Sequence, residues 1–240
     1  MPMPTQAGHT IMGQSPKLDI VMRQEQSLIG YTITNPKYHF SYLGIRNNNY
    51  ILKSDSSWNQ LQNALQFCMI AKEEKCNFLF VHTDGIYSNL LKYITKKTNQ
   101  SFADSSWTVG SLTNRMQTMK RFQLASRSVD TSIRDDKMYK KGSRSFRSHK
   151  TSLQRFLGLN YLVKKENQNK NPLPDIIILF NTEDTKDLVF EAKKLNIPII
   201  AFIDTKFEYP EYCTYPIFLN STNPHVFHTF CTYFLKIFQK

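Results

Sequence analysis

The sequence predicts an α/β fold with a mostly parallel, doubly wound sheet flanked by helices, and three observations support this. Two continuous apolar runs, 176–180 and 197–203, are separated by a helical pattern, which is typical of a βαβ unit whose strands are covered on both faces. A third apolar run, 77–81, lies between two further helical patterns. The 240 residues, 40% of them hydrophobic, suffice to bury one substantial core.

The N-terminal part divides into an arm and the start of the domain. Residues 1–17 show no periodicity and are predicted to form a flexible arm, whereas 18–240 are predicted to form a single α/β domain. Residues 38–45 are expected to form a packed loop or short strand, followed by a turn at 47–49 and a brief strand at 50–52.

The remaining predicted elements are helices that alternate with strands. Ser56 or Ser57 is expected to cap a helix whose apolar positions run from 61 to 69. The strand at 77–81, a helix over about 86–94 and a short strand at Phe102 follow. Near the C-terminus, Asn223 and Pro224 predict the start of the last helix.

Positive charge is concentrated in one segment. Residues 115–155 contain twelve Lys or Arg and three Asp or Glu, so this segment carries +9 of the chain's net charge of +12. Such a concentration on an otherwise nearly balanced protein indicates a nucleic-acid contact, and the alternative is a solvated basic face. We therefore predict a basic insert at about 116–162, helical or partly disordered, that interrupts the α/β domain.

The segment 107–114 is the most specific short motif. Trp107 is a large anchor, Gly110 permits a close turn, and Ser111 or Thr113 is a candidate cap for a helix beginning near Asn114. On its own the motif could be a structural connection between a strand and a helix.

Taken together, several spaced motifs resemble the second small-subunit ribosomal protein family over roughly residues 25 to 238. The residues that carry this resemblance are Trp107, Gly110, Leu112, Thr113, Asn114, Pro174, Asp175, Glu191, Ala192, Ile197, Pro198, Asp204 and Thr205. The resemblance implies a structural, non-enzymatic protein of the small ribosomal subunit. It also implies a doubly wound parallel sheet with a protruding helical hairpin that binds ribosomal RNA, and the basic insert is the candidate hairpin.

The sequence departs from the family pattern in three places, the first being Gly30-Tyr31, where the family commonly has Gly-His. Residues 215–221 lack a proline, a glycine and an aspartate that are usual in the family. The insert also lacks long apolar heptads, so RNA could be what orders it. These departures, with the composition rich in Phe, Tyr, Asn and Lys, favour a mitochondrial member, with the bacterial cytoplasm or a plastid as the alternatives.

The RNA-contacting residues are predicted from charge and spacing. Each of them could neutralise a phosphate and release counterions, which gives affinity that depends on salt but not on base sequence. The predicted set is Arg115, Lys120, Arg121, Lys137, Lys140, Lys141, Arg144, Arg147 and Lys150. The expected partners are small-subunit ribosomal RNA and neighbouring ribosomal proteins, with no membrane and no homo-oligomer.

Two alternatives remain open. A nucleotide-binding enzyme could use Asn181, Asp204 and Thr205 at the carboxyl ends of strands, where open α/β sheets usually keep their sites. Neither phosphate-binding glycine motif occurs, His225 and His228 are a weak metal signal, and the four cysteines lack metal spacing, so we expect no enzyme, cofactor or metal. A transient RNA-binding assembly factor would need the same basic segment as a permanent ribosomal protein.

Overall fold

A computed structural model describes residue 30 and residues 36–134, 156, 158–159, 173–220 and 223–239. Its centre is a five-stranded sheet in which all neighbouring strands are parallel. The spatial order is β4-β3-β5-β6-β7, so the chain builds outward from β3 in one direction and then from β5 in the other. This confirms the predicted parallel, doubly wound sheet. The strands are β3 (Phe78–Val81), β4 (Ser101–Ala103), β5 (Ile176–Leu179), β6 (Ile199–Ile203) and β7 (Tyr215–Phe218).

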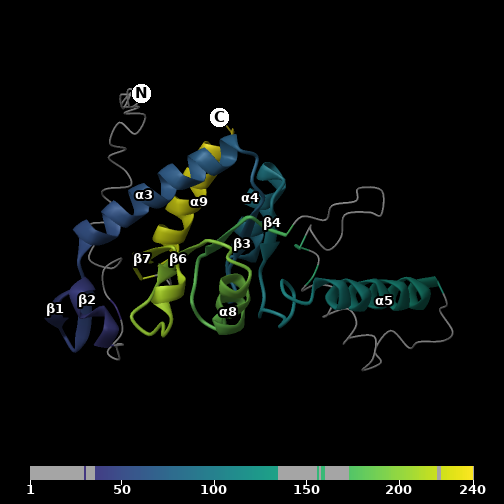
Figure 1. Cartoon of the computed structure of the whole chain (residues 1–240), viewed down its shortest axis with the longest axis horizontal. Helices are drawn as coiled ribbons and strands as arrows, with labels where there is room; N and C mark the ends of the chain where they lie inside the picture. Colours follow the sequence, from purple (N-terminus) through teal and green to yellow (C-terminus); the bar gives the residue numbers. More distant parts are fainter. Residues whose placement is uncertain are drawn as a thin grey trace, which may run out of the picture.

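Helices cover both faces of this sheet (Figure 1). Helices α3 (Ser54–Glu73), α4 (Ser88–Thr98) and α9 (Pro224–Gln239) pack on one face. Helix α8 (Lys186–Lys194) packs on the other, beside the loop that leads to α5 (Arg115–Arg134). A short 3-10 helix, η2 (Pro210–Tyr212), precedes β7. The strands are therefore buried on both sides, which explains their continuous apolar runs.

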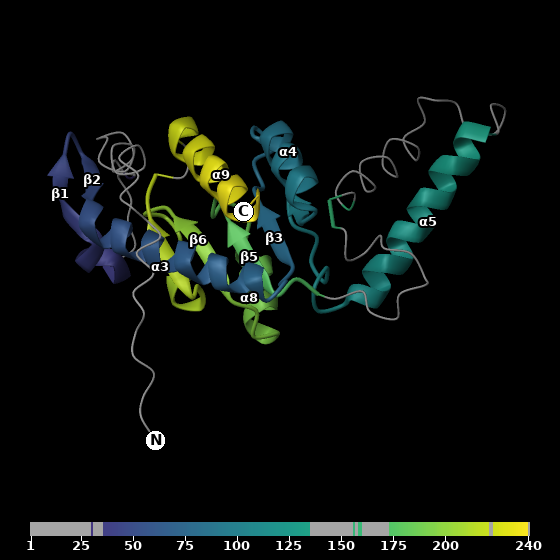
Figure 2. The ribbon, with the colours of Figure 1, turned by 90° about the horizontal axis from the view of Figure 1, so that it is seen from above.

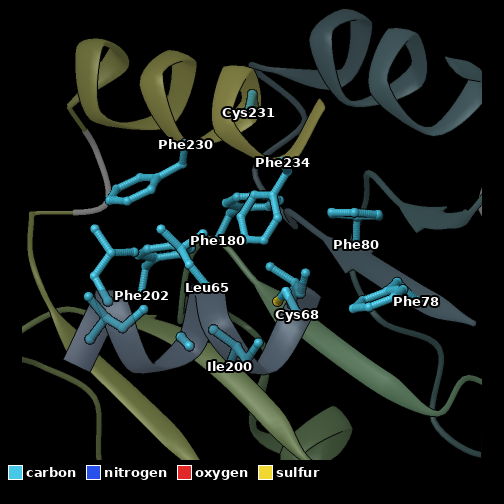
Figure 3. Close-up of a cluster of buried hydrophobic side chains, with 14 of the residues drawn as sticks. Leu65, Cys68, Phe78, Phe80, Phe180, Ile200, Phe202, Phe230, Cys231 and Phe234 are labelled. Atoms are coloured by element: carbon cyan, nitrogen blue, oxygen red, sulfur yellow. The ribbon is translucent and has the colours of Figure 1, made fainter. Parts of the chain in front are cut away.

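The face under α3 and α9 is filled with aromatic rings (Figure 3). Phe180 and Phe202, from neighbouring strands, stack with centroids 5.6 Å apart and planes 5° apart. Phe230 of α9 then packs on Phe202 at 4.4 Å. Aromatic pairs of this kind add about 0.5–1.5 kcal/mol to the burial of their apolar surface. This cluster fixes α9 against the sheet.

A separate antiparallel hairpin precedes the main sheet. It consists of β1 (Tyr42–Arg46) and β2 (Asn49–Leu52), after the 3-10 helix η1 (Pro36–Ser41). The predicted turn is confirmed: Asn47 and Asn48 have φ of 50° and 64°, a backbone that asparagine tolerates in tight hairpin turns.

The predicted cap of α3 is wrong. The N-cap of α3 is Lys53, without a side-chain cap, and Ser56 and Ser57 lie inside the first turn. Both hydroxyls donate back to the Lys53 carbonyl at 3.1 Å, and that of Ser57 also reaches the Phe218 carbonyl at 2.6 Å. The start predicted for α9 is confirmed, because Asn223 Oδ1 accepts the His225 amide at 3.0 Å.

Helix α5, the first part of the basic insert, projects away from the sheet (Figure 2). The chain meets the sheet edge again near residue 158, where the Phe102 amide of β4 donates to the Gly158 carbonyl at 2.8 Å. Phe156 is buried and contacts Phe122 of α5 edge-on at 6.1 Å. The insert therefore leaves and rejoins the domain beside β4. Within the described part of the chain, no helix has the length and apolar character needed to cross a membrane.

Candidate nucleic-acid interface

The loop between β4 and α5 is built around one buried carboxylate, that of Glu191 on α8. Glu191 Oε1 accepts the indole Nε1–H of Trp107 at 3.2 Å and the amide of Gly110 at 2.7 Å. Its Oε2 accepts the amides of Leu112 and Thr113 at 2.9 and 3.0 Å, and the Thr113 hydroxyl at 3.2 Å. Five donors from one loop thus converge on a single side chain.

Helix α8 places Glu191 where it can meet these donors. One side of this helix is buried and carries Leu188, Val189 and Ala192. Glu191 lies among them with 7% of its surface exposed. A carboxylate removed from water is costly unless hydrogen bonds replace its hydration. The loop supplies these hydrogen bonds. Its backbone amides lie outside any strand or helix and have no ladder partner, so the carboxylate in turn provides them with an acceptor. The role of Trp107 and Thr113 is therefore structural.

The same loop sets the start of α5. Gly110 has a φ of +85°, as expected for a close turn, and its carbonyl accepts the Thr118 hydroxyl of α5 at 3.1 Å. The Asn114 carbonyl accepts the amides of the first turn, those of Gln117 at 3.1 Å and Thr118 at 3.2 Å. Of the two candidate capping hydroxyls, that of Thr113 donates to Glu191, and that of Ser111 donates to the Thr108 carbonyl at 2.6 Å.

Three of the predicted RNA-contacting residues lie in the described part of α5. Lys120 and Arg121 are exposed, and Arg115 is half-buried at the base of the helix. Met116 and Leu124 are also exposed, with 58% and 64% of their surfaces accessible, so the outer surface of this helix mixes cations with apolar groups. The other six predicted residues lie outside the described residues: Lys137, Lys140, Lys141, Arg144, Arg147 and Lys150.

The polar groups at the strand ends bond to one another. Asn181 follows β5, and its Oδ1 accepts the Thr83 amide at 3.0 Å while its Nδ2 donates to the Thr83 hydroxyl at 2.9 Å. Thr83 follows β3, so this pair bridges the point where the strand order reverses. Open α/β sheets usually bind ligands at that point. Here the Asn181 side chain, which would be the one to contact a nucleotide, is instead hydrogen-bonded to Thr83.

Asp204 and Thr205 have structural surroundings as well. Asp204 Oδ1 accepts the Thr205 amide at 3.1 Å, and burial raises the pKa of Asp204 to about 6. Thr205 is 1% exposed, and a Cβ built on Gly30 would lie only 2.4 Å from its methyl carbon, so Gly30 is needed for this contact. Pro198 precedes β6, and its carbonyl accepts the Ile177 amide at 3.0 Å.

One buried polar residue was not singled out from the sequence. His82, at the end of β3, is 3% exposed and contacts the rings of Tyr87 and Phe227 at 5.1 and 5.0 Å. Neither ring nitrogen bonds to another described residue. Burial lowers the pKa of His82, and the nearby carboxylate of Asp84 opposes this shift. A histidine directly after an apolar strand gave no signal in the sequence that distinguished it from an exposed one.

No cluster of three or more His, Cys, Asp or Glu side chains suited to a metal ion occurs among the described residues. His225 and His228 are both exposed on α9. All four cysteines are free thiols. Burial raises the pKa of Cys68 and Cys213 to about 12, as expected for inert, buried thiols.

Comparison with known proteins agrees with this architecture. A model of the family described as ribosomal protein S2 matches residues 30–240. The chain belongs to the ribosomal protein S2 family.

Individual relatives are bacterial proteins named small ribosomal subunit protein uS2. That of Marinobacter nauticus is 27% identical over 71% of this chain and 66% of its own length. Those of Shewanella loihica and Shewanella pealeana are 30% and 31% identical, each over 71% of this chain and 69% of their own length. The matched part thus spans about two thirds of these relatives. Membership of a family of ribosomal proteins supports the prediction that the chain is not an enzyme.

Proposed function

We propose that the protein is a structural component of a small ribosomal subunit, and that it binds ribosomal RNA through the basic insert and supports subunit assembly. Family membership supports the ribosomal role. The structure supports the insert as the contact, because α5 projects from the domain and begins the segment that carries +9 of the chain's net charge. The neighbouring partners would be ribosomal proteins of the same subunit.

The anchoring of the insert is the observation that carries this proposal. A projecting helix can deliver cations to RNA only if its base is fixed relative to the domain, since a loosely attached segment loses conformational entropy on binding. Glu191 holds the loop before α5, and Phe156 and Gly158 hold the chain beside β4 where the insert ends. Lys120 and Arg121 are exposed beyond this base.

We further propose that the subunit is mitochondrial. The support is the drift from the family pattern at 215–221 and the composition rich in Phe, Tyr, Asn and Lys. The relatives named above are bacterial and do not test this point. Fractionation of source cells, with the tagged chain followed into purified organelles, distinguishes a mitochondrial subunit from a cytoplasmic or plastid one.

The ribosomal role is tested by sedimentation of a lysate through a sucrose gradient at moderately high salt. We expect the chain to sediment with the small subunit at about one copy per particle, as a component held by several phosphate contacts would. Release into the light fractions at the same salt would instead indicate a transient assembly factor and would refute a permanent structural role.

The RNA contact is tested with a variant in which Lys137, Lys140, Lys141, Arg144, Arg147 and Lys150 are all replaced by Gln. For the purified full chain and small-subunit ribosomal RNA, the magnitude of the slope of log K against log salt should fall by about 4–5, since each phosphate that is no longer neutralised lowers it by about 0.7–0.9. An unchanged slope would exclude these six residues as RNA contacts.

A further inference from the structure

Outside the insert, one surface of the domain is cationic on two adjacent helices. Helices α4 and α9 lie side by side on the same face of the sheet (Figure 2). Near their first turns, Tyr87 stacks on Phe227 with centroids 4.5 Å apart, so both helices begin at the same edge of the sheet. At the other end, Phe238 of α9 contacts Phe78 at the start of β3 at 4.9 Å. The two helices therefore run in the same direction.

The exposed side chains of α4 form one stripe. They recur at intervals of three or four residues, as one face of a helix does, and are Asn89, Lys92, Tyr93, Lys96 and Lys97. Leu91 and Ile94 occupy the opposite, buried side. On α9, among residues 225–238, the exposed ones are His225, His228 and Lys236, and Thr232 is half-buried between them. Neither helix contains an aspartate or a glutamate. We call these residues the α4–α9 face.

Helix α3, on the same side of the sheet, does not share this character. Its exposed residues among those whose side chains are described are Asp55, Asn59, Asn63, Gln66, Ile70 and Glu73, and none of them is a cation. Helix α8 has exposed lysines too, Lys186, Lys193 and Lys194, together with Asp187, but it packs on the opposite face of the sheet and does not extend this surface. Among the helices on the near side of the sheet, α4 and α9 thus carry exposed lysines and α3 does not.

Acidic groups neutralise only part of this face. Lys92 pairs with Asp104 at 2.8 Å, so its charge is largely compensated. Lys97 lies 5.8 Å from the ring centroid of Tyr93, and Lys236 lies 5.2 Å from that of Tyr233. An aromatic ring attracts a cation without cancelling its charge, so Lys97 and Lys236 remain available to an anion. Tyr93 is itself 53% exposed and offers a surface for stacking.

We propose that the α4–α9 face is a second RNA-binding surface, which contacts the phosphate backbone independently of the basic insert. The exposed chemistry fits RNA better than a protein partner. Protein interfaces are depleted of lysine and centred on apolar groups, whereas nucleic-acid interfaces are polar and strongly positive. Because the two helices run in the same direction, Lys96 and Lys97 in the last turn of α4 and Lys236 in the last turn of α9 lie toward the same end of this face. Such a group of cations suits the charges of a phosphate backbone.

This inference rests on the proposed function, and its test separates the two. The variant Lys96→Gln, Lys97→Gln, Lys236→Gln removes three exposed cations and replaces them with a residue that favours helix about as well as lysine does. The matched control Lys53→Gln, Lys194→Gln, Lys206→Gln removes the same charge from exposed positions elsewhere on the domain. The full chain is titrated with a labelled RNA duplex of about 20 base pairs, between about 0.05 and 0.2 M salt.

We expect the α4–α9 variant to lower the slope of log K against log salt by about 2, while the control leaves it within about 0.5 of the wild type. The reduction should persist when the six insert residues are also replaced by Gln. A wild-type slope for the α4–α9 variant with a reduced slope for the insert variant would overturn this inference and leave the proposed function standing. Wild-type slopes for both variants would overturn both.

An equal fall in the slope for the α4–α9 variant and its control would mean that only the net charge of the protein matters, and would also refute the proposal. If the α4–α9 variant binds RNA as the wild type does but is absent from small subunits in the sucrose gradient, the face binds a protein instead.

Discussion

Replacing Glu191 with Gln is the most direct test of how the insert is anchored. The substitution preserves shape but turns one carboxylate oxygen into an NH₂ donor. If this donor takes the Oε1 position, it faces the Trp107 indole and the Gly110 amide, and two hydrogen bonds are broken. If it takes the Oε2 position, it faces the amides of Leu112 and Thr113. Either orientation leaves two backbone or indole donors opposite another donor.

The structure sets the size of this effect. Hydrogen bonds to charged groups contribute about 1.5–3 kcal/mol each, and the removal of two predicts a fall of about 3–6 kcal/mol in the free energy of unfolding. Domains of this size are stable by about 5–15 kcal/mol, so the variant should still fold but unfold at much lower denaturant. Urea unfolding followed by tryptophan fluorescence measures this directly, and Trp107 should also shift to longer emission wavelength as its loop is released.

The control is Glu183→Gln, an exposed position that undergoes the same change in charge. It should leave the free energy of unfolding within about 0.5 kcal/mol of the wild type. A Glu191→Gln chain as stable as this control, with unchanged Trp107 emission, would refute the view that Glu191 holds the loop.

Three further predictions concern single residues. Gly110→Ala should lower the free energy of unfolding by about 1–2 kcal/mol, because a Cβ at φ +85° is strained and would lie 3.2 Å from Asn114 Cβ; urea unfolding measures this. Asp204→Asn should raise stability at pH 7.5 by up to about 3 kcal/mol, because the folded pKa of about 6 exceeds the ordinary 3.8, so burial of the ionised carboxylate costs stability that is recovered as pH falls through this window. Burial lowers the pKa of His82 below 6.5 in the folded protein, so as pH falls the unfolded chain binds the proton first. Stability should therefore fall as pH drops below about 6.5, and His82→Leu should remove this contribution of His82 to the pH dependence.

Each of these predictions has a contradicting outcome. Wild-type stability of Gly110→Ala would mean that the loop relaxes at no cost. A gain from Asp204→Asn that persists unchanged to pH 4 would exclude burial of charge as its cause. The His82 component is read as the difference between the variant and the wild type, because Asp204 changes stability in the opposite direction between about pH 4 and 6. Parallel pH curves for the two proteins would show that His82 is not involved.

Local sequence patterns were sufficient for four of the five strands of the main sheet, whereas β7 was not predicted. Strands β3, β5 and β6 were predicted because continuous apolar runs are typical of strands covered on both faces. The turn at Asn47 and Asn48 and the start of α9 at Asn223 depend on neighbouring residues and were also predicted correctly. The cap of α3 was not, since Ser57 is drawn inward by the Phe218 carbonyl, 161 positions away in the chain.

The candidate site divides in the same way. Net charge and spacing are properties of the sequence, so the basic insert could be located without a structure, and the family resemblance placed Glu191 without giving it a role. The stripe of lysines on α4 was present in the sequence but became a surface only when α9 was found beside it. Sequence spacing shows which residues share a helix face, and it does not show which second helix extends that face.

The sequence by itself therefore determined the properties that depend on near neighbours, namely the buried strands, the turns and the charged segment. Motifs spread along the chain also determined that it belongs to the ribosomal protein S2 family. The tertiary structure decided how distant polar groups pair. Asn181 meets Thr83 across 98 positions, and Glu191 meets Gly110 across 81. The reason is physical: a buried polar group must find a partner wherever the packed chain offers one, and that partner depends on the arrangement of the sheet as a whole.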